Sequence, residues 1–257
     1  MVDKEFYNFI VNVKKKTGID LVKYKEEQLK RRLTTLYIKN GFTNFDHYFS
    51  NMQTNKTLFN EFLDKITINV TEFYRNPSLW EVLEREIIPL VQEEERKIKC
   101  WSSACSTGEE PYTLAMILNE QGITNAEILA SDLDEGVLSK AKQGIYFEKA
   151  LKDLPKRYTD KYFEIKDLNF EISNTIKRNV NFKRFDLLVD TFASNYDLII
   201  CRNVMIYFTE EANTQLYLKF SEALRSGGVL FVGSTEQIFR PEKYNLEMVG
   251  PFFYRKK

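Results

Sequence analysis

The stretch Cys100–Met116 decides the fold, and it reads CWSSACSTGEEPYTLAM. Polar and apolar residues alternate up to Trp101, a run of small residues follows, and leucine and alanine then recur at helical spacing. We therefore predict a strand, a tight loop and a helix in succession. In a parallel α/β sheet, ligands bind at such a junction because the first backbone N–H groups of the helix are unpaired. The sequence thus predicts a ligand site in this loop.

The residues of the loop indicate which ligand it suits. Its small side chains let a ligand approach the backbone, Thr107 can cap the helix, and Pro111 suits the first turn. The loop lacks the G-x-G-x-x-G pattern of dinucleotide sites, and the carboxylates of Glu109 and Glu110 would repel a pyrophosphate. They would suit an amine or a ribose hydroxyl. An ordinary connection whose glutamates favour the helix dipole remains the alternative.

Composition argues against several classes of function. The 257 residues carry 37 basic and 37 acidic side chains, so no global field favours nucleic acid. With one histidine, His47, and three cysteines without C-x-x-C spacing, we expect no histidine triad and no metal site. We find no long apolar run and no signal peptide. We therefore expect a cytoplasmic protein with reduced cysteines and no membrane insertion.

The pattern divides the chain into a helical part and a part with alternating strands and helices. Apolar residues at helical spacing predict helices over about residues 6–17, 24–40, 44–52, 57–68, 77–95 and 209–225. Apolar runs predict strands near residues 97–101, 126–132, 180–185, 196–201, 229–233, 247–249 and 252–254. Residues 145–179 suggest short alternating strands with a turn at 166–169, and Gly227-Gly228 is predicted as a turn.

Three motifs carry a resemblance to a known family. Besides WSSACSTGEEPYTLAM at 101–116, residues 69–75 read NVTEFYR and residues 202–208 read RNVMIYF. Together they resemble the signatures of the CheR-type chemoreceptor methyltransferases, which transfer a methyl group from S-adenosyl-L-methionine to glutamate side chains of methyl-accepting chemotaxis proteins. Many members have glycine where this chain has Ala104, and phenylalanine where it has Tyr74. The resemblance covers nearly the whole chain.

The resemblance implies a fold and a domain plan. It implies an α/β protein with the class I S-adenosylmethionine-dependent methyltransferase sheet, which is Rossmann-like, a small N-terminal all-helical domain and an inserted antiparallel β-subdomain. We expect the helical domain over residues 1–76, a linker helix over 77–95, and the methyltransferase domain over 96–257 with its insertion around 145–180. The alternation of helices and strands with an antiparallel finish fits this class.

The resemblance also assigns site residues. Arg75 is implied to orient the acceptor carboxylate and Tyr207 to shape the methyl-transfer pocket. The residues implied to contact the methyl donor are Asn69, Thr71, Arg75, Glu109, Asp132, Asp186, Leu187, Asn203 and Val204.

Two of these aspartates need comment. Asp132 ends a strand 24 residues beyond Gly108, near the offset at which Rossmann-like folds bind ribose hydroxyls. A strand-end aspartate is more often a helix cap, but the resemblance favours the ribose, and we expect Asp134 to be the cap instead. Asp186 stands where the family usually has asparagine. It can accept a hydrogen bond from the adenine amino group and cannot donate one.

A basic helix is the expected partner surface. Lys25, Arg32 and Lys39 are seven residues apart and share a helix face, with Lys30 and Arg31 beside them. Such a face is usually just solvated. The resemblance implies that it meets acidic, glutamate-bearing receptor helices. No glycine occurs between Gly144 and Gly227, which favours a member that works without a receptor tether, and we expect a monomer.

The expected chemistry needs no general base. A glutamate side chain has a pKa of about 4.3, so it is already a carboxylate nucleophile at neutral pH. Catalysis then amounts to alignment of acceptor, methyl and sulfur. Zero net charge and the absence of a (D/N)-P-P-(Y/F) motif disfavour a nucleic-acid methyltransferase. A methyltransferase for another carboxylate or a small molecule, and a donor-binding signalling or scaffold module, remain alternatives.

Overall fold

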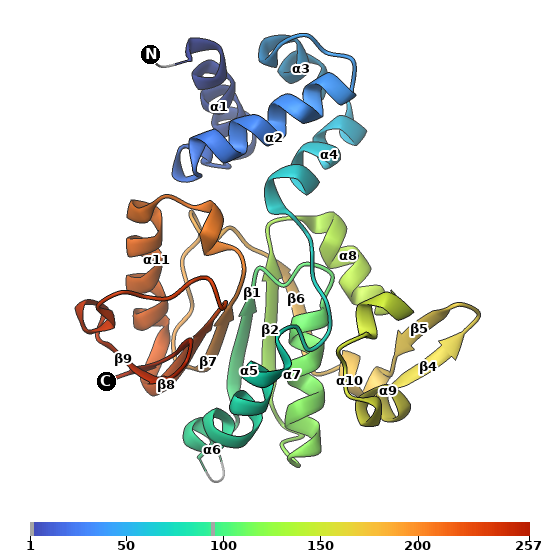
Figure 1. Ribbon diagram of the computed structural model, residues 1–257, viewed down its shortest axis with the longest axis vertical. Coiled ribbons are helices and arrows are strands. Elements are labelled where there is room, and N and C mark those ends of the chain that lie inside the picture. Colours follow the sequence, from blue (N-terminus) through green and yellow to red (C-terminus); the bar gives the residue numbers. More distant parts are fainter. Residues whose placement is uncertain (1–2, 94–95) are drawn as a thin grey trace. The chain divides into compact units, whose positions relative to one another are not determined.

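The computed structural model describes residues 3–93 and 96–257 as two compact units (Figure 1). The helical unit contains the chain up to Ile68 together with Asp186–Thr191 and Val204–Leu216. The sheet unit contains Asn69–Phe185, Phe192–Asn203 and Tyr217–Lys257.

The helical unit is built around an aromatic core. Its helices are α1 (Lys4–Thr17), α2 (Glu26–Lys39), α3 (Phe45–Met52) and α4 (Lys56–Thr67), with short 3-10 helices at Leu21–Lys23 and Met205–Tyr207. Phe9 is fully buried and its ring contacts those of Phe45 and Phe62 from α3 and α4. Asp3 caps α1 through the backbone N–H groups of its first turn, and Gly18 ends it with a left-handed φ of 81°. The helices predicted here are confirmed, and His47 is exposed on α3.

The sheet unit contains a seven-stranded sheet in the order β6-β2-β1-β7-β8-β10-β9. Its strands are β1 (Lys99–Ser103), β2 (Glu127–Asp132), β6 (Val180–Arg184), β7 (Tyr196–Cys201), β8 (Leu224–Val232), β9 (Leu246–Gly250) and β10 (Phe253–Lys256). The first five in this order are parallel, and β10 is antiparallel to both of its neighbours. The predicted sheet class, with its antiparallel finish, is confirmed.

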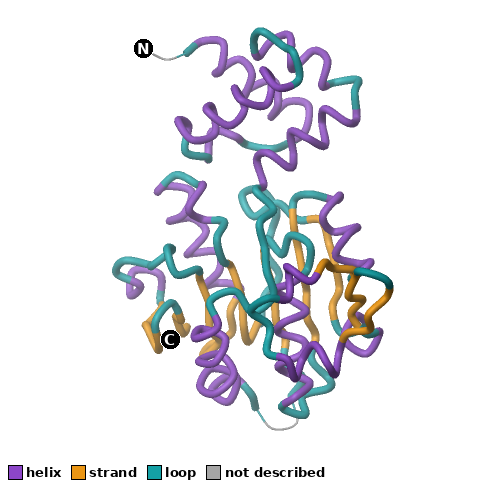
Figure 2. The backbone as a smooth tube through the Cα atoms, turned by 45° about the vertical axis from the view of Figure 1, so that its right-hand side comes forward, coloured by secondary structure: helices purple, strands orange, loops and turns teal. Residues whose placement is uncertain are grey.

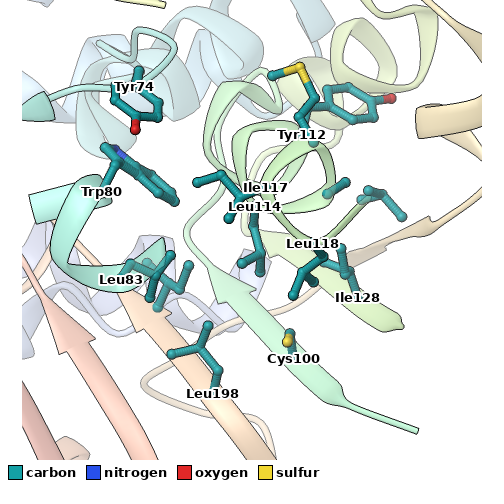
Figure 3. Close-up of a cluster of buried hydrophobic side chains, with 14 of the residues drawn as sticks. Tyr74, Trp80, Leu83, Cys100, Tyr112, Leu114, Ile117, Leu118, Ile128 and Leu198 are labelled. Atoms are coloured by element: carbon teal, nitrogen blue, oxygen red, sulfur yellow. The ribbon is translucent and has the colours of Figure 1, made fainter. Parts of the chain in front are cut away.

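Alternate residues of β1 face opposite layers. Cys100 packs with α7 (Glu109–Glu120) and with α5 (Pro77–Val82) in a cluster that contains Trp80, Leu114 and Leu198 (Figure 3). Trp101 points to the other face of the sheet. There its ring contacts the ring of Phe192 and that of Phe220, which lies on α11 (Glu210–Ala223). Helices therefore cover both faces of β1, as a buried parallel strand requires.

A second sheet forms the inserted subdomain. Strands β3 (Ile145–Phe147), β5 (Asn169–Ile172) and β4 (Phe163–Lys166) are antiparallel in that order. Figure 1 labels β4 and β5, and Figure 2 draws the strands in orange. It follows α8 (Glu135–Gln143) and includes a 3-10 helix at Glu148–Leu151, α9 (Lys156–Tyr162) and α10 (Asn174–Lys177). Asp167 adopts a φ of 56° in the predicted turn. The predicted strands are confirmed, whereas the short helices were not predicted.

Two predicted boundaries are wrong. The helix predicted to run to residue 95 passes through a π-helical turn at Leu83–Ile87 into α6 (Ile88–Val91) and ends there, because Gln92 is extended; residues 94 and 95 lie outside the described chain. Gly227 and Gly228 lie inside β8 rather than in a turn before it. A Cβ on Gly228 would lie 2.7 Å from the carbonyl oxygen of Tyr196, so glycine permits the close approach of β7 and β8.

A buried carboxylate ties the first residues of the parallel strands together. Asp197 of β7 is fully buried, and it accepts hydrogen bonds from the backbone N–H of Lys99 (2.8 Å) and from the guanidinium groups of Arg96 and Arg225. Arg225 also donates to the carbonyl of Val91 at 2.8 Å. This network joins β1, β7 and β8 at the end of the sheet where these strands begin.

We predict that Asp197→Ala lowers the free energy of unfolding by about 3–5 kcal/mol, because it leaves buried donors unpaired. Urea denaturation followed by circular dichroism measures the loss. Glu93→Gln is the matched control, since Glu93 pairs with the same Arg225 but is exposed. A loss for Asp197→Ala no larger than for Glu93→Gln would contradict this account.

Candidate active site

The loop between β1 and α7 has an unusual backbone. Ala104, Ser106 and Gly108 adopt left-handed φ angles of 59°, 49° and 95°. A Cβ on Gly108 would lie 3.0 Å from Cβ of Ala141 and 3.2 Å from the hydroxyl of Tyr146. Glycine at position 108 therefore allows the start of α7 to pack closely against Ala141 and Tyr146.

Asp132 holds this loop from the end of β2. Its Oδ2 accepts the backbone N–H of Ser106 at 2.8 Å, and its Oδ1 accepts the N–H of Asp134 at 3.1 Å. Burial raises the pKa of the Asp132 carboxyl to about 6. Asp134 caps α8 through the N–H of Gly136, as predicted, and also accepts from the side-chain amide of Asn69 at 3.3 Å.

Glu109 is buried at the first position of α7. The helix is capped by Gly108, so the prediction that Thr107 caps it is wrong; the Thr107 hydroxyl instead donates to the Glu109 carboxylate at 2.8 Å. Within the described chain Glu109 forms no ion pair, and burial raises the pKa of its carboxyl to about 7. A buried carboxylate without a cation is a ready partner for a cationic ligand.

Arg75 lies in the loop between α4 and α5 with two other predicted site residues, Asn69 and Thr71. The residues on either side of Arg75, Tyr74 and Asn76, have left-handed φ angles of 57° and 62°. The backbone N–H of Tyr74 donates to the hydroxyl of Thr113 on α7, which places this loop against the helix that starts with Glu109. Arg75 is half-buried, and its guanidinium donates to the carbonyl of Val70 at 3.3 Å.

A buried arginine that was not predicted as a site residue lies directly after β7. Arg202 is 6% exposed, and its Nη2 donates to the carbonyl oxygen of Arg75 and to Oδ1 of Asn76, both at 2.9 Å. Its Nη1 lies 3.7 Å from a carboxylate oxygen of Glu110. Glu110 also accepts from the hydroxyl of Ser102 at 2.9 Å, and burial raises the pKa of its carboxyl to about 7.

A second buried residue supports Asn203. The backbone N–H of Asn203 donates to Oε2 of Glu236 at 2.6 Å, and the N–H of Gly233 donates to the same oxygen at 2.9 Å. Asn203 has a left-handed φ of 59°. Neither Arg202 nor Glu236 was predicted. Two signals were available for Arg202: it is the first residue of the motif at residues 202–208, and it is a charged residue directly after an apolar strand. No such signal was available for Glu236.

The other predicted site residues belong to the helical unit. Asp186 accepts the N–H of Leu188 at 2.8 Å, and Leu187 is buried. Tyr207 accepts the N–H of Lys25 at its carbonyl oxygen (2.9 Å), and the Arg32 guanidinium lies 4.6 Å from the centre of its ring. Val204 lies in the same segment. The six other predicted residues, Asn69, Thr71, Arg75, Glu109, Asp132 and Asn203, lie in the sheet unit.

The residues of the sheet unit fit S-adenosyl-L-methionine. The hydroxyl of Ser106 is buried without a hydrogen-bond partner in the described chain. The Asp132 carboxylate accepts two backbone N–H groups and keeps lone pairs for ribose hydroxyls, while Glu109 suits the amine. The residues that the structure describes include no group of His, Cys, Asp or Glu arranged to hold a metal. None of the helices among them is long and apolar enough to cross a membrane.

The sheet order, the antiparallel β10 and a ligand loop after β1 define the class I methyltransferase fold. Residues 69–251 match the family model described as the CheR methyltransferase SAM binding domain, and residues 4–67 match the CheR methyltransferase all-alpha domain. The chain belongs to the CheR methyltransferase family.

Curated relatives match this chain over most of their length. The chain is 40% identical to a chemotaxis protein methyltransferase of Listeria monocytogenes, covering 99% of this chain and 98% of the relative. It is 37% identical to one of Borreliella burgdorferi (93% and 89% covered) and 30% identical to one of Escherichia coli (94% and 87% covered).

We predict that Glu109→Gln removes a pH dependence of stability. Because the pKa of Glu109 is raised to about 7 in the folded state, the native protein binds more protons than the unfolded chain between about pH 4.5 and 7. Its stability therefore falls as the pH rises through this window. From pH 5 to pH 8 the stability of the wild type should fall by about 1–3 kcal/mol relative to Glu109→Gln.

Urea denaturation at a series of pH values measures this difference. Glu135→Gln is the control, because Glu135 is exposed in the first turn of α8. If the two variants differed from the wild type by the same amount at every pH, the assignment of a buried, proton-binding Glu109 would be wrong.

Proposed function

We propose that this protein transfers the methyl group of S-adenosyl-L-methionine to glutamate side chains of chemoreceptors, forming methyl esters that serve sensory adaptation. The observation that carries the proposal is the pair of buried carboxylates, Asp132 and Glu109, at the loop after β1 in a chain of the CheR family. In the same proposal the chain acts in the cytoplasm as a monomer. The proposed domain division is a helical domain over residues 1–76, a linker over 77–95 and a methyltransferase domain over 96–257.

The protein contributes to the reaction by aligning the acceptor carboxylate with the methyl group and sulfur of the donor. The bound donor supplies a methyl group already activated on a sulfonium, and an acceptor glutamate is ionised at neutral pH. We assign donor contacts to Asn69, Thr71, Arg75, Glu109, Asp132, Asp186, Leu187, Asn203 and Val204. Arg75 orients the acceptor carboxylate and Tyr207 shapes the pocket. Because the carboxylate loses its charge on methylation, too strong an ion pair with Arg75 would stabilise the substrate more than the transition state.

The basic helix α2 supplies the proposed receptor contact. Of the five basic residues, Lys25 is the N-cap of α2 and the other four lie within the helix. They differ in their surroundings: Lys30 pairs with Asp3 at 2.7 Å and Arg32 lies against Tyr207. Lys25, Arg31 and Lys39 are exposed. We assign the long-range attraction of acidic receptor helices mainly to these three residues.

The direct test is methyl transfer to a receptor cytoplasmic fragment. With radiolabelled S-adenosyl-L-methionine, label should enter the wild-type reaction as a base-labile ester and disappear when the receptor glutamates are changed to alanine. Arg75→Ala should lower kcat/KM for the fragment by about 100-fold, because the acceptor carboxylate is no longer aligned. Arg85→Ala is the matched control, since Arg85 is exposed on the turn that follows α5.

Three outcomes separate the alternatives. Unchanged turnover in Arg75→Ala with donor binding intact would contradict the role of Arg75. Donor binding without transfer to any receptor fragment would favour a sensing or scaffold module. Base-labile transfer to other proteins alone would favour a methyltransferase for a different carboxylate.

Charge reversal tests the receptor surface. The double variant Arg31→Glu, Lys39→Glu should raise KM for the receptor fragment about tenfold at low ionic strength, with a smaller effect at high salt, and leave donor affinity unchanged. The control is Lys15→Glu, Lys16→Glu on α1, which makes the same change in net charge at exposed positions. Equal effects of the two double variants would mean that net charge, and not this face, guides the receptor.

A further inference from the structure

The carbonyl oxygen of Arg75 accepts two side-chain hydrogen bonds. One comes from Nη2 of Arg202 at 2.9 Å, and the other from the indole Nε1 of Trp80 at 3.0 Å. Both donors belong to buried residues. The peptide bond between Arg75 and Asn76 is therefore held by two buried hydrogen-bond donors, which are shielded from water.

The loop needs such restraints. Left-handed φ angles on both sides of Arg75, at Tyr74 and Asn76, cost free energy in residues other than glycine. Such a conformation persists where surrounding contacts over-determine it. Arg202 meets this need at two points, because the same Nη2 also donates to Oδ1 of Asn76 at 2.9 Å.

Arg202 is itself held rigidly. Its guanidinium lies 4.7 Å from the centre of the Phe231 ring and 5.5 Å from that of Trp80, and Glu110 balances its charge. Trp80 in turn stacks on Tyr74, as their positions in Figure 3 show. The planar group is thus enclosed by aromatic rings and aimed at the loop 69–76.

The position of Arg202 in the chain gives it a second connection. It follows Cys201, the last residue of β7, and precedes Asn203, whose backbone N–H is held by Glu236. One side chain therefore joins the carboxyl end of the central strand to the loop that carries Arg75.

We propose that Arg202 is a positioning residue of the methyl-transfer reaction, which fixes the backbone of Arg75 so that the Arg75 guanidinium meets the acceptor carboxylate. This inference rests on the proposed function of Arg75. Arg202 acts through Arg75 and has no contact of its own with the acceptor in this assignment. Lysine cannot replace it, because an ammonium group lacks the planar fork that lies against two rings while donating to two acceptors.

A double-mutant cycle tests the inference. Arg202→Lys should lower kcat/KM for a receptor cytoplasmic fragment by about 10- to 100-fold in the wild-type background. In the Arg75→Ala background the same change should cost less than about threefold, because the group that it positions is gone. A residue that merely stabilises the fold would give the same factor in both backgrounds.

Two further variants complete the design. Arg225→Lys is the control for a partly buried, ion-paired arginine in the same unit, and it should lower the melting temperature without changing kcat/KM. Trp80→Phe removes the second donor to the Arg75 carbonyl and keeps an aromatic ring; it should cost about three- to tenfold in the wild-type background and little in Arg75→Ala. If Arg202→Lys does not fold, the Trp80→Phe cycle decides.

The outcomes separate the two claims. An equal loss in both backgrounds, or no loss in Arg202→Lys, would overturn the positioning role while leaving Arg75 as assigned. No effect of Arg75→Ala by itself would contradict the proposed function of Arg75 and the inference with it.

Discussion

The hydrogen bond from the backbone N–H of Ser106 to the carboxylate of Asp132 is the interaction on which the site depends. It spans two neighbouring parallel strands at their carboxyl ends, where the loop after β1 adopts left-handed φ angles that its residues would otherwise avoid. Because Asp132 is buried, the bond is shielded from water and fixes the start of α7. The same carboxylate keeps lone pairs that can accept hydrogen bonds from a ligand.

Buried charge is concentrated along this edge of the sheet. Glu109, Glu110, Arg202 and Glu236 are all largely shielded from solvent near the ends of β1, β7 and β8. Arg202 and Glu236 hold backbone groups of the neighbouring loops, while Glu109 has a hydroxyl partner and no ion pair in the described chain. Arg202 and Glu236 therefore stabilise the conformation of the site. Glu109 has no positively charged partner among the described residues, and a cationic donor can supply one.

The sequence was informative where chemistry is local. The strand, loop and helix around Gly108, the cap at Asp134 and the short strands near Asp167 follow from spacing and turn residues. The prediction that Thr107 caps α7 was wrong, because Gly108, with a left-handed φ, is the N-cap of this helix. Arg202 and Glu236 were not predicted, since their partners are set by strand register: Arg202 meets a carbonyl 127 residues away. The residues next to Arg202 in the sequence therefore do not predict this contact.

The most direct measurement of the central claim is the number of protons released when S-adenosyl-L-methionine binds. Isothermal titration calorimetry in buffers of different ionisation enthalpy gives this number. Because burial raises the pKa of Glu109 to about 7, a cationic donor that ionises it should release about half a proton or more at pH 6.5, and less as the pH approaches 8.5. Glu109→Gln should lose most of this release. Donor binding with no proton release at pH 6.5, or with the same release in Glu109→Gln, would contradict the account.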